Sequence, residues 1–142
     1  MTGSMEVKYG QVYSRLKIMI SDAKFVSFTT DLWSNRKKKI SFLRFILKVI
    51  KTIFGEFSLT IHFIDDNFER KFYVLSTEPF NEAHNAQNIS NVFADLLKQF
   101  EINMANVHIV LRDAQSSMIA GIESLELEHF DCMVHKIQLV RI

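Results

Sequence analysis

The sequence of 142 residues has little cysteine, proline or glycine, with one, one and four copies. Cys132 has no second cysteine to pair with, so an internal disulfide is excluded and nothing indicates an oxidising compartment. The shortage of glycine and proline argues against long irregular loops. Residues 1–10 are polar and lack the apolar stretch of a signal peptide. With 48% hydrophobic and 23% charged residues, the simplest interpretation is an intracellular globular protein.

The sequence also has no large excess of positive or negative charge, since its net charge is +1. The cations are unevenly placed, because residues 36–51 contain seven Lys and Arg and no acidic residue. The rest of the chain has 10 basic and 16 acidic residues, a balance of −6. Phosphate binding depends on clustered Lys and Arg. We therefore expect no strong DNA binding outside residues 36–51.

Hydrophobic periodicity predicts an N-terminal helix within residues 1–24 and one α/β domain over residues 25–142. The domain should contain a three-strand meander, a long helix, a fourth strand and two further helical segments. The expected bounds are 5–23 for the first helix, 25–33, 57–64 and 68–77 for the meander, 88–101 for the long helix, 107–112 for the fourth strand, and 115–125 and 130–141 for the last two segments. A helical crossover after a meander implies a mixed sheet, in which the fourth strand is parallel to its neighbour.

Local signals refine two of these helices. The apolar stripe of the first helix is expected to include Val12, Leu16, Met19 and Ala23. The long helix follows a polar loop over residues 79–88, and Asn85 or Asn88 is its expected N-cap.

Two aspartates follow strands in a related way. Asp31 lies near the end of the first strand, and Asp113 lies at the end of the fourth. If these strands pair in parallel, their axes are about 4.8 Å apart and both carboxylates project at one sheet edge. Mg²⁺ or Mn²⁺ suits such oxygen ligands, and two such ions can activate an attacking hydroxyl and stabilise a leaving oxygen. On spacing alone, acids after strands are more commonly caps or turn residues.

Four segments, in order, resemble hAT-superfamily transposases and their domesticated relatives with BED-type zinc fingers. They are FVSFTTDLWSN over 25–35, SLTIHFID over 58–65, AHNAQNI over 83–89, and the segment 109–140. The family's T-D-x-W motif matches Asp31 and Trp33, its second aspartate matches Asp113, and its C-x-x-H pair matches Cys132 and His135.

The resemblance implies the N-terminal part of a ribonuclease H-like domain that cleaves and joins DNA. It makes Asp31 and Asp113 catalytic ligands of Mg²⁺ or Mn²⁺, and it places Trp33, Cys132 and His135 beside the active site or the DNA. It further implies a nuclear location, a DNA partner and a homodimer of a full-length parent. An alternative is a non-enzymatic DNA- or protein-binding module in the nucleus. From the residues alone, Trp33 favours a core role, and one Cys and one His are too few for structural zinc.

The chain departs from the family pattern in three places. The family's T-D-N is Arg-Asp-Ala here, over residues 112–114. The family's third catalytic residue, a glutamate after a large helical insertion, would lie beyond Ile142, so we expect this chain alone to be inactive. Residues 37–56 form a basic, apolar insertion. It is interpreted either as an amphipathic helix over 37–54 that lies on a membrane or on DNA, or as an accidental insertion tolerated by a hairpin loop.

Overall fold

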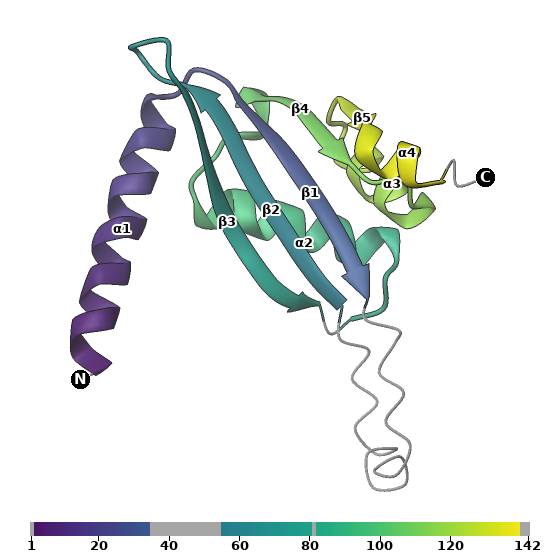
Figure 1. Ribbon diagram of the computed structural model, residues 1–142, viewed down its shortest axis with the longest axis horizontal. Helices are drawn as coiled ribbons and strands as arrows, with labels where there is room; N and C mark the ends of the chain where they lie inside the picture. Colours follow the sequence, from purple (N-terminus) through teal and green to yellow (C-terminus); the bar gives the residue numbers. More distant parts are fainter. Residues whose placement is uncertain (1, 35–54, 81, 140–142) are drawn as a thin grey trace, which may run out of the picture.

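The computed structural model describes residues 2–34, 55–80 and 82–139 (Figure 1). In chain order the elements are α1 (Thr2–Asp22), β1 (Val26–Ser34), β2 (Gly55–Ile64), β3 (Arg70–Phe80), α2 (Ala86–Gln99), the short 3-10 helix η2 (Met104–Asn106), β4 (Val107–Arg112), α3 (Ser116–Glu123), β5 (His129–Asp131) and α4 (Met133–Leu139). The helix hypothesised over 37–54 lies outside the described residues.

The five strands form one mixed sheet in the order β3-β2-β1-β4-β5. The first three pair antiparallel as a meander, and β1 pairs parallel with β4, which pairs parallel with β5. The mixed sheet is confirmed, as is the prediction that the strand after the crossover is parallel to its neighbour. That neighbour is β1, the strand that carries Asp31.

The hydrophobic core lies between one face of this sheet and the helices. Along β2, Phe57, Leu59, Ile61 and Phe63 are buried on this face, and they alternate with half-buried Ser58, Thr60 and His62 on the other. Phe28 of β1 meets Phe93 of α2 edge to face, with ring centroids 5.5 Å apart. Figure 1 shows α2 crossing behind the strands. The period-2 pattern of β2 therefore decides which face of the sheet the helices cover.

Helix α1 packs on the domain only through its C-terminal half. Ile20 and Ala23 belong to the core, and the hydroxyl of Tyr13 donates to the carbonyl of Gln99 at 2.8 Å. Lys17 forms an ion pair with Glu101 at 2.6 Å. The prediction that Val12 lies on the buried stripe is wrong, because 64% of its surface is exposed. Figure 1 shows this helix beside β3, with its N-terminus away from the sheet.

Helices α2 and α3 pack closely against each other at Gly121. A methyl group at this position would lie 2.9 Å from a side-chain atom of Ile89 and 3.0 Å from the carbonyl oxygen of Ala86. Helix α2 begins at Asn85, whose side chain accepts from the N–H of Asn88 at 2.8 Å, which settles the choice between the two expected caps.

Three of the expected bounds are corrected. The segment 130–141 is not one helix, because His129–Asp131 form β5 before α4 begins. The insertion is shorter than 37–56, because Gly55 and Glu56 pair with Ser34 and Trp33 as part of β2. The loop expected from Pro79 begins later, because β3 continues to Phe80. Proline is tolerated there because β3 is an edge strand, where a missing N–H costs no ladder bond.

Replacing Gly121 with alanine should destabilise the fold by about 1–3 kcal/mol, the usual cost of overpacking a tight contact. The same substitution at Gly10, where a methyl group meets nothing within 4 Å, should instead stabilise α1 by about 0.5–1 kcal/mol. Urea unfolding of the two variants measures both effects. Equal stability of the Gly121→Ala variant and the unsubstituted chain would show that α2 and α3 are not in close contact.

His62 lies on the sheet face opposite the core helices and is half-buried. Its Nε2 lies 2.8 Å from the hydroxyl oxygen of Thr29, and its ring is stacked 6.3 Å from Phe72. Burial, and then the positive charge of Arg70, lower the pKa of His62 from its ordinary value. The folded chain therefore takes up a proton at His62 less readily than the unfolded chain does.

This lowered pKa predicts a pH dependence of stability. The free energy of unfolding should be constant above the ordinary histidine pKa of about 6.5, and it should fall as the pH drops from there towards the lower folded value. Urea midpoints measured at pH 7.5 and 5.5 test this, with His62→Gln as the comparison because glutamine keeps a partner for Thr29 without titrating. An equally steep loss of stability in both chains would rule out His62 as its source.

Candidate functional site

The parallel strands β1, β4 and β5 bring three aspartates to one edge of the sheet. Asp31 lies near the end of β1, Asp113 directly follows β4, and Asp131 is the last residue of β5. Because parallel strands share a direction, their carboxyl ends meet at the same edge. We refer to Asp31, Asp113 and Asp131 with their surroundings as the carboxyl edge.

Asp31 and Asp113 occupy equivalent places in the parallel register. Thr29 of β1 is paired with Leu111 of β4, and each aspartate follows its strand's member of that pair by two residues. Paired strands lie about 4.8 Å apart, so the two main chains are close at Thr29 and Leu111, the last pair of these strands. Asp31 is half-exposed, with 40% of its side chain accessible, so a ligand can reach its carboxylate.

Asp113 also has a local structural role. Its Oδ1 accepts a hydrogen bond from the N–H of Gln115 at 2.7 Å, which forms the turn between β4 and α3. The sequence spacing alone favoured a turn role for Asp113, and Oδ1 has that role. The turn does not engage the second oxygen, so it does not exclude ligand binding by the same side chain.

His135 is brought to Asp31 by α4. Its Nε2 lies 3.8 Å from Oδ1 of Asp31, and 34% of the His135 side chain is accessible. Its other ring nitrogen, Nδ1, is buried and has no hydrogen-bond partner among the described residues. Buried ring nitrogens normally have a hydrogen-bond partner, so this atom is an exception among the described residues.

Cys132 is the residue between β5 and α4. Its N–H donates to the carbonyl of Arg112 at 2.6 Å, and its own carbonyl accepts from the N–H of Lys136 at 3.2 Å. The thiol is free and partly buried. The main chain of Cys132 therefore joins the sheet to α4, which orients the helix that carries His135. The main chain of Trp33 lies in β1 opposite Glu56, and its side chain is not among the described groups.

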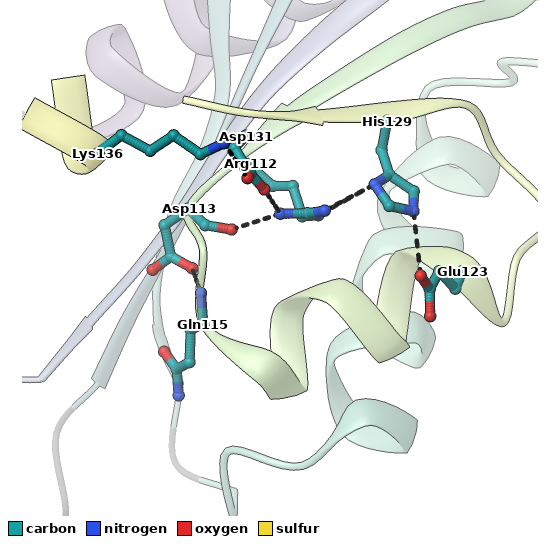
Figure 2. Close-up of polar contacts among 7 residues, drawn as sticks. All are labelled: Arg112, Asp113, Gln115, Glu123, His129, Asp131 and Lys136. Atoms are coloured by element: carbon teal, nitrogen blue, oxygen red, sulfur yellow. Dashed lines mark hydrogen bonds and ion pairs between the residues drawn. The ribbon is translucent and has the colours of Figure 1, made fainter. Parts of the chain in front are cut away.

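A buried arginine, which the sequence did not single out for chemistry, organises the neighbouring part of the edge (Figure 2). Arg112 is 5% exposed, and its guanidinium donates to the Asp131 carboxylate and, at 2.9 Å, to the carbonyl of Asp113. On the other side, Nε and Nη2 of Arg112 lie 3.2 and 2.9 Å from Nδ1 of His129. The other nitrogen of His129 faces Glu123 at 3.8 Å.

Asp131 links two cations from different elements. One carboxylate oxygen binds Arg112 of β4, and the other lies 2.7 Å from Nζ of Lys136 in α4. These hydrogen bonds, from Lys136 first and then Arg112, hold the pKa of Asp131 below its ordinary value. Its two oxygens are engaged with these cations, which makes Asp131 a structural anion and a poor candidate for metal binding.

A divalent ion at this edge would have few protein ligands. Among the described residues no group of three His, Cys, Asp or Glu is arranged to hold a metal. Mg²⁺, however, is usually bound through one or two carboxylates, with waters and phosphate oxygens completing the octahedron. Asp31 and Asp113, each two residues beyond the last β1–β4 pair, are the two carboxylates that such an ion would use here. In the described part of the chain no helix is long and apolar enough to cross a membrane.

Comparison with known proteins gives no further assignment: no family model matches the chain, and no curated protein matches it.

Removing the Asp113 carboxylate should weaken the start of α3. We expect Asp113→Ala to lower the free energy of unfolding by about 1 kcal/mol, the usual net cost of losing one hydrogen bond, here the one that forms the turn before α3. Asp113→Asn should cost much less, because its amide oxygen can accept from the same N–H. Urea unfolding of both variants gives the comparison, and an alanine variant as stable as the asparagine variant would contradict the turn.

Proposed function

We propose that this chain is part of a ribonuclease H-like domain of the hAT-transposase type, which binds a divalent metal ion at Asp31 and Asp113 and acts on the phosphodiester backbone of DNA. The observation that carries the proposal is the parallel register of β1 and β4, because each aspartate follows a member of the last β1–β4 pair, Thr29 and Leu111, by two residues. A three-strand meander followed by a helical crossover to a parallel strand is also the arrangement that the sequence resemblance implies.

The surroundings of Asp31 support this proposal. The side chain is accessible, and His135, which matches the family's C-x-x-H motif, lies 3.8 Å from it. A histidine at that distance can donate a hydrogen bond from Nε2 to a phosphate oxygen bound beside Asp31. Cys132 contributes through its main chain, which fixes the start of α4.

Each group then has a definite role. A bound Mg²⁺ or Mn²⁺ would stabilise charge on the phosphodiester and lower the pKa of an attacking water or hydroxyl. Asp31 and Asp113 would hold the ion, and His135 would orient the phosphate. Two carboxylates hold an ion less firmly than three, so we expect metal binding without measurable strand transfer by this chain alone. A nuclear location would follow from action on chromosomal DNA.

Metal binding by the purified chain tests the proposal directly. Mn²⁺ should bind, and Asp31→Asn and Asp113→Asn should each weaken its affinity by about tenfold or more, since even outer partners of metal ligands contribute that much. The measurement is the free Mn²⁺ signal in electron paramagnetic resonance during a titration. Asparagine preserves the size of both side chains and the turn at Gln115, so a loss of affinity reports the charge.

A matched control is Asp95→Asn, which removes one carboxylate from the exposed face of α2, away from the carboxyl edge. Its Mn²⁺ affinity should equal that of the unsubstituted chain. If all three asparagine variants bind Mn²⁺ equally well, the ion is bound elsewhere and the proposed site is wrong.

A further inference from the structure

Arg112 lies where the resemblance leads one to expect a small polar residue, and its contacts extend to both sides of the proposed site. It directly precedes Asp113 and donates to the Asp113 carbonyl at 2.9 Å. It also binds Asp131, which in turn binds Lys136 of α4. One guanidinium thus contacts the main chain of one proposed ligand and, through an ion pair, the helix that carries His135.

The attachment of α4 to the rest of the fold depends strongly on these contacts. Strand β5 is three residues long and pairs with β4 through Val110, Leu111 and Arg112. Helix α4 has seven residues, and its apolar side chains Met133, Val134 and Ile137 are mostly exposed. Since these three side chains bury little apolar surface, polar contacts at Arg112 and Asp131 contribute strongly to the orientation of α4.

The guanidinium is suited to this role because of its shape. Arg112 contacts Asp131, the Asp113 carbonyl and His129 at the same time, in three directions from one planar group. A lysine at this position keeps the positive charge but has a single nitrogen, so it cannot keep all three contacts. Its low exposure means that water does not readily replace a lost contact.

We infer that Arg112 is a positioning residue, which holds His135 beside Asp31 and fixes the main chain at Asp113. It acts through Asp131 and Lys136 on α4, and through its hydrogen bond to the Asp113 carbonyl on the β4–α3 turn. Its consequence for metal binding rests on the proposed function. Its consequence for the placement of His135 does not, because that can be measured in the metal-free chain.

The test is a double-mutant experiment on the ring nitrogens of His135, followed by nuclear magnetic resonance at one neutral pH without metal. In the otherwise unsubstituted chain, Asp31→Asn should move the His135 ring ¹⁵N signals, because Asp31 lies 3.8 Å from Nε2. In the Arg112→Lys background the same substitution should leave them unmoved. Amide exchange over residues 129–137 should become about tenfold faster or more, while β1 and β2 keep their protection.

Two further variants separate positioning from stability. Gly121→Ala destabilises the α2–α3 contact without touching Arg112, so it should preserve the response of His135 to Asp31→Asn. Lys136→Met removes the α4 end of the ion pair from a side chain that is 51% exposed, so the fold should persist and the response should weaken. If Arg112→Lys does not fold, Lys136→Met alone decides the question.

Mn²⁺ affinity gives the second readout. Arg112→Lys should weaken it by about tenfold, and Gly121→Ala should leave it unchanged. An unsubstituted chain that binds no Mn²⁺ would overturn the proposed function and leave the His135 measurement as the test of Arg112. A full response of His135 to Asp31→Asn in both the Arg112→Lys and Lys136→Met backgrounds would overturn the inference.

Discussion

The parallel pairing of β1 with β4 is the constraint on which the rest of the structure depends. A parallel neighbour cannot be reached by a tight turn, so the chain must cross over, and α2 is that crossover. The crossover buries the apolar stripe of α2 against Phe28 and the central strands. It also returns the chain in the direction of β1, so that β4 and β5 end at the same edge as β1. Both the core and the carboxyl edge are therefore consequences of one strand pairing.

Much of this arrangement could be predicted because its signals are local and repeated. In β2 the alternation from Phe57 to Phe63 predicts which residues are buried. In α2 the spacing of Ile89 and Phe93 predicts the buried face of the helix. Each of these patterns is made of several side chains, so one residue that departs from it does not change the predicted element. The places of Asp31 and Asp113 followed from the expected strand order, and the register of Thr29 with Leu111 bears that order out. Whether the two carboxylates share an ion stays a prediction.

The parts that could not be predicted are short or depend on distant partners. Strand β5 has three residues, too few to show alternation, and Phe130 in its middle is 61% exposed, so its apolar character suggested a helix instead. The spacing of Val12 fits the apolar stripe of α1. Val12 is exposed, however, because only the C-terminal half of α1 packs on the domain. The burial of Arg112 could not be predicted from the sequence for another reason. A charged residue at a strand end is normally solvated, and only a partner from another strand makes its burial tolerable.

That partner also explains how an arginine can be buried at position 112, where the motif that the sequence resembles has a threonine. A buried guanidinium at Arg112 requires an anion in direct contact with it, and the partly exposed Asp131 supplies one from the neighbouring strand. Asp131 would in turn be poorly placed without a cation, so neither residue can be explained alone. Lys136 then extends the pair to α4 and keeps Asp131 ionised, since both partners lower its pKa. Arg112 and Lys136 together neutralise the Asp131 carboxylate at the end of β5. Asp31 and Asp113 therefore remain the two ligands that we propose for a divalent ion at this edge.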